Sequence, residues 1–416
     1  MTILKRILIG VSLLVIGVGI AGAVLYTKQD MIPDLEAPET RDTAVAEAKY
    51  APVVETVRDM LVGQRAGLSA PSMSVAVASG GRIVWAETVG YADIGTLAPA
   101  TTQTRYLIGS VSKPITAALT MKLVEAGRLD LDRSIRDYLP SFPKKRHKIT
   151  LRQLLSHQAG VRHYGFMFKP PLFSETLLNK QFDTLADSLT IFKDDALLFE
   201  PDTDFQYSTF GYTLISAVIE AATGERFEDL AAEYVFQPLQ MANTAPDDTL
   251  NPQQNRATDY TAIFGNGTVS VAPDVNVSYK IAGGGFISTP SDLTMFGMAL
   301  LGPDLFSKRS KEAMFTARKF TSGAVNPQRY GLGWRIGGLQ MTEKGSEETY
   351  ILPLIHHGGT SVGSVSILFL IPDYDIVIAL TANTVGTSGG SSPLTRVAAQ
   401  IAYAFLEFEQ GLQATE

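Results

Sequence analysis

Ser110 and Lys113 stand three residues apart at the start of an apolar helical pattern, and this spacing can support nucleophilic catalysis. Side chains three positions apart share one face of a helix, so the amine can reach the hydroxyl. A lysine whose pKa is lowered by burial can act as the base that activates a serine toward a carbonyl. A helix N-terminus at Ser110 would add free backbone N–H groups. On its own, the pair fits an ordinary helix cap equally well.

Two other serines match catalytic patterns but lack the structural context. Ser141 and Lys144 repeat the spacing in a proline-containing basic loop with no apolar helix behind it. Residues 359–363 match Gly-x-Ser-x-Gly, which requires a helix directly after the serine. A β pattern follows instead at 364–371, and no histidine follows His357 to complete a triad in the required order. We therefore favour Ser110 over Ser361.

Tyr207 opens the segment Tyr207-Ser208-Thr209, which lies between Pro201 and a helical pattern. A tyrosine held near a lysine cation can serve as a proton shuttle, because the cation lowers its pKa. A lone tyrosine is more often a packed aromatic, so this segment indicates a catalytic role only in combination with the other motifs.

The run His356-His357-Gly358-Gly359 leads toward a strand. Small residues there would let a substrate approach, and a strand N–H can face an oxyanion. Neither histidine has a carboxylate or a third histidine at metal-ligand spacing, so we predict no metal and no cofactor.

Composition narrows the class of protein. The 416 residues are 45% hydrophobic, enough for a sizeable core, and the formal charge of -7 disfavours a nucleic-acid partner. The chain contains no cysteine, which excludes disulfides and a thiol nucleophile.

The N-terminus predicts a membrane anchor. Residues 7–26 form an uncharged, mostly apolar run that is long enough to span a bilayer, preceded by Lys5 and Arg6. The positive-inside rule then predicts a single-pass protein of the cell inner membrane, with 1–6 as a cytoplasmic tip and the catalytic part periplasmic. Residues 27–50 are predicted to be a polar tether. Cleavage of a signal peptide near residues 21–23 is the alternative, which the length of the run disfavours.

Hydrophobic periodicity predicts the elements that must position these residues. We expect a helix from Pro52, a hairpin turning at Gly80-Gly81, mainly helical structure over 110–281, and an amphipathic helix over 394–408. Strands are predicted at 330–336, 364–371 and 376–382. The order predicts an α/β (α+β) fold, an antiparallel sheet flanked by terminal helices with an inserted all-α domain. The α/β domain would comprise 51–105 and 282–416, and the mainly helical domain 106–281.

Together the motifs resemble those of class C β-lactamases, D,D-carboxypeptidases and related esterases, which are penicillin-binding serine hydrolases. Ser110-x-x-Lys113 is similar to the first motif, residues 207–209 to the Tyr-x-Asn position, and residues 356–358 to the Lys-Thr-Gly position in a His-x-Gly variant. A narrower set of segments resembles the mitochondrial serine β-lactamase-like branch of this family. These segments are 160–164, 199–201, 207–213, 278–280 and 282–286, and the similarity covers roughly residues 50–410.

The resemblance implies a site between the α/β and helical parts, and a role for each residue. Ser110 would attack the carbonyl, while Lys113 and Tyr207 would move its proton to the leaving group as a coupled pair. The N–H groups of Ser110 and Gly359 would form the oxyanion hole. His356 would orient the substrate or assist Tyr207.

Two departures from the family pattern affect the expected substrate. Thr209 replaces the usual Asn, and His356 replaces Lys, which removes a permanent cation and weakens the grip on a β-lactam or D-Ala-D-Ala carboxylate. If His356 works as a cation, activity should fall as pH rises through its pKa. We predict a hydrolase that acts through an acyl-enzyme on small peptides or esters. The alternatives are a β-lactamase or D,D-carboxypeptidase, and a non-catalytic scaffold that forms homo-oligomeric filaments or binds the cell wall.

Overall fold

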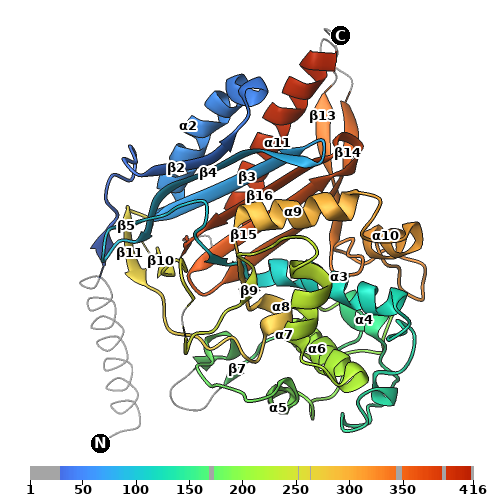
Figure 1. The fold of residues 1–416 in the computed structure, drawn as a ribbon. Coiled ribbons are helices and arrows are strands. Elements are labelled where there is room, and N and C mark those ends of the chain that lie inside the picture. Colours follow the sequence, from blue (N-terminus) through green and yellow to red (C-terminus); the bar gives the residue numbers. More distant parts are fainter. Residues whose placement is uncertain are drawn as a thin grey trace, which may run out of the picture.

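The structure is a computed structural model that describes residues 29–167, 173–251, 253–262, 264–342, 349–386 and 390–413. Its centre is an antiparallel sheet of eight strands in the order β13-β14-β15-β16-β3-β4-β2, with β5 paired to β4 (Figure 1). The strands are β2 (Arg41–Ala46), β3 (Ser72–Ser79), β4 (Arg82–Asp93), β5 (Ala98–Pro99), β13 (Arg335–Thr342), β14 (Thr349–Ser361), β15 (Ser364–Ile371) and β16 (Ile376–Ala382).

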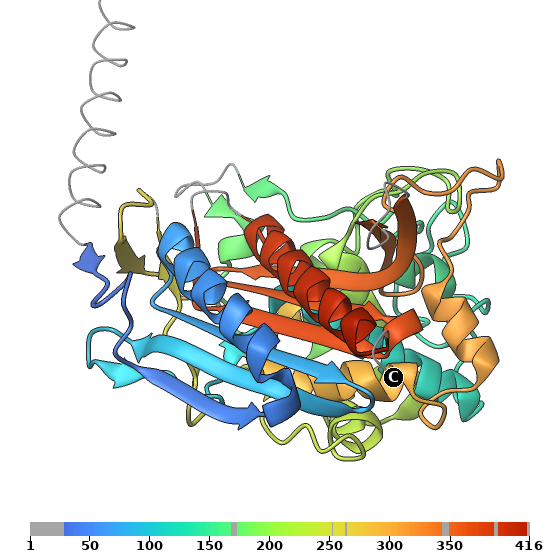
Figure 2. The ribbon, with the colours of Figure 1, turned by 90° about the horizontal axis from the view of Figure 1, so that it is seen from above.

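Helices cover both faces of this sheet, which explains why β15 and β16 are mostly apolar and are buried along their whole length. On one face, α2 (Ala51–Leu68) and α11 (Ser392–Gln413) lie side by side (Figure 2). They bury Val57 and Ile401 in one cluster with Ile367. On the opposite face, α9 (Pro290–Leu301) contacts β16 and β3.

The helical part lies below α9 in Figure 1 and surrounds α3. Nearly every residue of α3 is buried, so this helix runs through the core. The helices here are α3 (Ser112–Glu125), α4 (Leu151–Leu155), α5 (Leu185–Ser188), α6 (Thr209–Thr223), α7 (Phe227–Ala231), α8 (Ile281–Gly284) and α10 (Lys308–Phe315).

Short elements connect these layers. The small strands are β1 (Asp30–Met31), β6 (Tyr106–Leu107), β7 (Phe166–Met167), β8 (Phe173–Ser174), β9 (Ala245–Pro246), β10 (Tyr260–Thr261), β11 (Thr268–Val271), β12 (Phe286–Ser288) and β17 (Thr384–Val385). The short helical turns are η1 (Ala48–Tyr50), η2 (Gly109–Val111), η3 (Ile135–Asp137), η4 (Glu175–Leu177), η5 (Leu189–Ile191), η6 (Ala232–Phe236) and η7 (Pro372–Tyr374).

The predicted fold class is confirmed, as are the first hairpin, the strands at 364–371 and 376–382, and the C-terminal helix. The predicted strand over 330–336 is wrong, because β13 begins at Arg335. Gly333 explains the difference. Its φ of +88° lies in the left-handed region, and an added Cβ would stand 2.5 Å from the Cβ of Ala117. The chain therefore turns tightly against α3 before it extends.

The predicted tether over 27–50 is also wrong wherever the structure describes it. Strand β2 pairs with β4 at the edge of the sheet, and β1 pairs with β11. The buried guanidinium of Arg65 donates to the carbonyls of Asp34 at 3.1 Å and Leu35 at 2.9 Å. Residues 29–50 are therefore part of the globular body.

The predicted cytoplasmic tip and anchor, 1–6 and 7–26, lie outside the described residues. Within the described ranges, none of the helices combines the length and the apolar character needed to cross a bilayer. The boundaries drawn between the α/β and helical domains at 106 and 281 stay a prediction.

Candidate active site

Ser110 lies in η2, directly before α3 and against β14. Gly109 allows this position because its φ is +50° and an added Cβ would stand 2.7 Å from the carbonyl carbon of Thr360. The hydroxyl of Ser110 therefore faces a cleft of about 600 Å³ between the sheet and the helical part. Tyr207, Thr209 and His356 line the same cleft.

Lys113 is fully buried beneath Ser110. Its Nζ lies 3.1 Å from the Oγ of Ser110, 3.2 Å from the Oγ1 of Thr209 and 2.6 Å from the carbonyl oxygen of Gly283. Burial, together with the charge of Arg335, holds the pKa of Lys113 well below its usual value. In the neutral form, the amine can donate to Gly283 and Thr209 and keep its lone pair for the proton of Ser110.

Tyr207 completes this arrangement from the loop before α6. Its ring centroid lies 4.8 Å from the Nζ of Lys113. Burial raises the pKa of Tyr207, while the charge of Arg335 and hydrogen bonds with Ser110 and Arg335 act against that rise. The raised pKa of the phenol and the lowered pKa of the amine favour two neutral groups. A neutral amine can act as a base and a neutral phenol can donate a proton, so Lys113 and Tyr207 could fill these two roles.

Arg335 is the cation that the sequence analysis missed. It opens β13 opposite His356, and its guanidinium lies 5.3 Å from the ring centroid of Tyr207. Its Nε and one terminal nitrogen donate to the side-chain oxygen of Gln328 at 3.2 and 2.9 Å. The expectation that the site lacks a permanent cation is therefore wrong. Nothing in the local sequence marks Arg335, because only the β13–β14 register brings it to the cleft.

His356 lines the cleft, but its ring packs against Phe369, with centroids 5.6 Å apart. Burial and the charge of Arg335 lower the pKa of His356 to about 4. The imidazole is therefore neutral near pH 7, which removes the basis for a cationic role and for the fall in activity expected from it. Successive strand residues face opposite ways, so His357 is the ring nearer Tyr207, at 6.3 Å between centroids. Its Nε2 lies 2.9 Å from the hydroxyl of Tyr330.

Gly359, the predicted second oxyanion donor, packs directly on the chain that leads into Ser110. An added Cβ at Gly359 would collide with the carbonyl of Ile108. The segment that carries the predicted donor therefore lies beside the chain that leads into Ser110, and the role of the Gly359 N–H group stays a prediction.

The two other serine patterns lie where the sequence analysis expected. Ser361 ends β14 at the turn into β15, so a strand follows it and not a helix. Ser141 and Lys144 belong to an irregular loop and do not line the cleft.

Two histidines hold the segment that carries Tyr207. The Nδ1 of His157 accepts from the N–H of Ser208 at 3.1 Å, and the Nδ1 of His163 accepts from the N–H of Thr209 at 3.2 Å. Both rings must therefore be neutral, with the proton on Nε2. Burial lowers the pKa of His157 well below its usual value and that of His163 to about 4.

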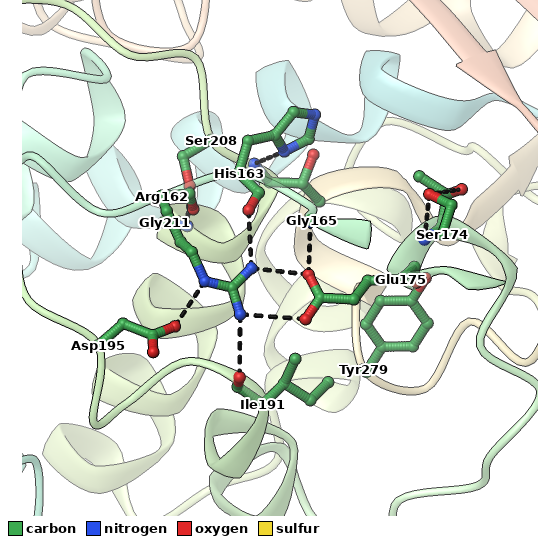
Figure 3. A network of polar contacts seen from close by, with 12 residues as sticks. Arg162, His163, Gly165, Ser174, Glu175, Ile191, Asp195, Ser208, Gly211 and Tyr279 are labelled. Carbon is green, nitrogen blue, oxygen red and sulfur yellow. Dashed lines mark hydrogen bonds and ion pairs between the residues drawn. The ribbon is translucent and has the colours of Figure 1, made fainter. Parts of the chain in front are cut away.

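Arg162 anchors the loop behind this segment (Figure 3). Its guanidinium binds both carboxylate oxygens of Glu175, at 2.6 and 3.0 Å, and also Asp195 and the carbonyl of Ile191. The hydroxyl of Ser208 donates to the carbonyl of Arg162 at 2.6 Å. The network therefore ties the Tyr207 segment to a rigid ion-pair cluster.

These histidines predict that the fold weakens in mild acid. The unfolded chain takes up protons below about pH 6.5, whereas folded His157 and His163 resist them. The free energy of unfolding should therefore fall as pH drops from 6.5 toward 4. Urea unfolding between pH 7 and 4.5 measures this slope. We expect His163→Asn, which keeps an acceptor, to reduce the slope. An equal slope in His163→Asn and wild type would contradict this prediction.

Comparisons with known proteins show which family the chain matches. A family model described as Beta-lactamase matches residues 57–403. The chain is similar to the mitochondrial serine beta-lactamase-like protein LACTB of Homo sapiens, with 29% identity over an alignment of 402 residues. The match covers 78% of this chain and 73% of the relative.

Solved structures share the fold. The octameric penicillin-binding protein homologue from Pyrococcus abyssi aligns with a TM-score of 0.69 at 23% identity, over 85% of this chain and 77% of the other. The D-amino acid amidase from Ochrobactrum anthropi SV3 aligns with a TM-score of 0.67 at 22% identity, over 88% of this chain and 100% of the other.

Proposed function

The chain belongs to the β-lactamase family and is a serine hydrolase of this family, and from this premise we propose that it cleaves small peptide or ester substrates through an acyl-enzyme on Ser110. The observation that carries the proposal is the position of the buried amine of Lys113, 3.1 Å from the hydroxyl of Ser110 and 4.8 Å from the ring centroid of Tyr207. A nucleophile, a base and a proton donor thus meet at the floor of one cleft.

The reaction follows from these contacts. The Nζ of Lys113 takes the proton of Ser110 as its Oγ bonds to the substrate carbonyl carbon, and the carbonyl oxygen becomes an oxyanion. When the bond to the leaving group breaks, that group takes a proton from Tyr207, and the proton held by Lys113 restores the phenol. Water then attacks the ester on Ser110 and gives one proton to the same pair. The pair passes this proton to the Oγ of Ser110 as the bond between Oγ and the acyl carbon breaks and the acid is released. Lys113 and Tyr207 end as they began.

Relatives support amide and ester chemistry. One similar structure is a D-amino acid amidase, and another, EstCE1, is described as a hydrolase with promiscuous acyltransferase activity. Thr209 stands in place of the usual Asn, and its hydroxyl accepts a hydrogen bond from Lys113. No amide is therefore present at this position to hold a β-lactam side chain. We therefore place peptide or ester hydrolysis before β-lactam or D-Ala-D-Ala turnover.

A fluorophosphonate probe tests this function on the full chain in detergent. We expect rapid labelling of wild type, complete loss in Ser110→Ala, and unchanged labelling in Ser361→Ala, which removes the other candidate serine of the cleft. Nitrocefin hydrolysis at a comparable rate would favour the β-lactamase alternative. A well-folded wild type that takes no label would refute the enzyme and favour a filament-forming or cell-wall-binding scaffold.

We also propose that residues 7–26 anchor the protein in the cell inner membrane, with the catalytic body in the periplasm. The length of the apolar run and the positive charges at Lys5 and Arg6 support this arrangement. Removal of residues 1–26 should move the protein from the carbonate-resistant membrane fraction to the soluble fraction. A full chain that is soluble after cell lysis would refute the anchor and leave the proposed chemistry untouched.

A further inference from the structure

The guanidinium of Arg335 is held in place by neutral groups. The side-chain oxygen of Gln328 accepts from its Nε at 3.2 Å and from one terminal nitrogen at 2.9 Å. The other terminal nitrogen lies 3.3 Å from the Nε2 of His357. The Nδ1 of His357 lies 2.8 Å from the carbonyl oxygen of Gly358, so Nδ1 carries the proton and Nε2 is an acceptor. These contacts fix the position of the cation and leave its charge unbalanced.

The acidic group that faces this cation is a phenol. Among the described residues, Arg335 has no carboxylate within ion-pair distance, and no Asp or Glu lines the cleft. The guanidinium lies 5.3 Å from the ring centroid of Tyr207 and 5.5 Å from that of Tyr330. The hydroxyl of Tyr330 already donates to the Nε2 of His357 at 2.9 Å. Tyr207 is therefore the phenol whose ionisation the charge of Arg335 can favour.

The other ionisable groups around the pair are mostly uncharged near pH 7. Burial lowers the pKa of the neighbouring imidazoles, to about 4 or further below the usual value, at His157, His163, His356 and His357. Burial raises the pKa of the neighbouring phenols of Tyr164, Tyr212 and Tyr330. It also lowers the pKa of the amine of Lys113. Lys280, directly before α8, also lines the cleft, and burial and the charge of Lys113 lower its pKa to about 8. Burial raises the pKa of Tyr207, and the charge that opposes this rise is that of Arg335.

The proposed reaction creates a negative charge at Tyr207. When the bond between the acyl carbon and the leaving nitrogen breaks, its electron pair stays on the nitrogen, which takes the phenolic proton. The phenol becomes a phenolate until the ammonium of Lys113 gives it a proton. A buried anion without a partner is costly, so a fixed cation beside the ring lowers the free energy of this step.

We propose that Arg335 is a positioning residue that acts through Tyr207: its guanidinium stabilises the phenolate while the leaving group takes the proton. Gln328 and His357 hold the cation at the required place. This inference rests on the proposed function, because it assumes that the leaving group receives its proton from Tyr207.

The ionisation of Tyr207 tests the proposal without a substrate. The full chain in detergent is produced with ring-fluorinated tyrosine, and the fluorine NMR resonance of Tyr207 is the one that is lost in Tyr207→Phe. We expect this resonance to titrate at a pH higher by about 1–3 in Arg335→Gln than in wild type, the effect of losing an opposite charge. Arg335→Lys should restore most of the difference. Arg329→Gln, an exposed arginine whose Nε donates to the carbonyl of Ile336, is the control. The same titration in Arg335→Gln and wild type would overturn the proposal.

A second variant covers the case in which melting curves show that Arg335→Gln is unfolded. Gln328→Leu keeps the charge but removes the acceptor that holds it. The resonance of Tyr207 should then move in the same direction by a smaller amount. An unchanged resonance in folded Gln328→Leu would count against the role of this anchor and of the cation that it holds.

Turnover of N-acetyl-alanine p-nitroanilide tests the effect on the reaction. In Arg335→Gln, kcat should fall by about 10–100-fold with KM within about 3-fold of wild type. In the Tyr207→Phe background, the same substitution should change kcat by less than about 3-fold, because the two residues act as one unit. A raised KM in both backgrounds would show that Arg335 binds the substrate instead.

Failure of the inference and failure of the function give different results. Ser110-dependent turnover that Arg335→Gln leaves unchanged would overturn the role of Arg335 and leave the hydrolase in place. A folded wild type that takes no fluorophosphonate label would overturn the function and, with it, this role.

Discussion

Replacement of Lys113 by methionine should lower the rate of peptide or ester hydrolysis by roughly 10⁴-fold or more. Methionine has a similar length, but it cannot take the proton of Ser110 or donate to the carbonyl of Gly283. The loss should appear in kcat and in the rate of fluorophosphonate labelling alike, because both need an activated Ser110. The measurement is the labelling half-time of wild type and variant at equal concentration.

The same experiment has a control on the same helix. Lys122 also lies in α3, but its Nζ donates to the carbonyl of Leu305 at 2.9 Å, away from the cleft. Lys122→Met should label within about 2-fold of wild type. A Lys113→Met protein that is folded and labels as fast as wild type would eliminate the amine as the base.

The lowered pKa of Lys113 sets the direction of the pH dependence. Its neutral form is the base, so activity should be present above its pKa and be lost as pH falls through it. Because that pKa lies well below the ordinary value for lysine, the enzyme should work at neutral pH without an alkaline optimum.

Replacement of Tyr207 by phenylalanine should separate poor leaving groups from good ones. Turnover of an anilide should fall by about 10²–10⁴-fold, because the departing amine loses its proton donor. Acylation by p-nitrophenyl acetate should fall less than about 10-fold, because its leaving group departs without a proton. A burst of p-nitrophenol release and steady-state anilide turnover measure the two effects. Equal losses for both substrates would show that Tyr207 acts on the nucleophile and not on the leaving group.

Tyr138→Phe provides the comparison for this variant. Its hydroxyl accepts from the N–H of Asp130 at 2.9 Å, in a loop that does not line the cleft. Both activities should therefore stay within about 2-fold of wild type.

Local patterns predicted the parts of the site that depend on neighbouring residues. The spacing of Ser110 and Lys113 is a property of one helix, and the alternation over 364–371 is a property of one strand. The grouping of Tyr207 with Ser110, 97 positions away in sequence, came from the family resemblance and not from periodicity. The β2 strand escaped prediction because its polar sequence pairs at a sheet edge, where pairing needs little apolar character.

The two cations of the cleft walls could not be predicted in this way. Arg335 reaches the cleft because Gly333 turns the chain just before β13. Lys280 lies directly before α8, whose Gly283 packs against Thr209. Each position depends on contacts between segments far apart in the chain. A single sequence does not distinguish a lysine or an arginine on the open surface from one that lines a cleft.

The hydrogen bonds from Arg65 to the carbonyls of Asp34 and Leu35 limit how far the folded body can lie from the proposed anchor. Because the folded body already includes β1 at Asp30, three intervening residues, 27–29, separate it from the proposed end of the anchor at residue 26. Even fully extended, such a stretch spans roughly 10–14 Å. With the proposed anchor, the catalytic body would lie directly at the lipid surface. It would then meet molecules at the bilayer face first, and molecules deeper in the periplasm would have to diffuse to it.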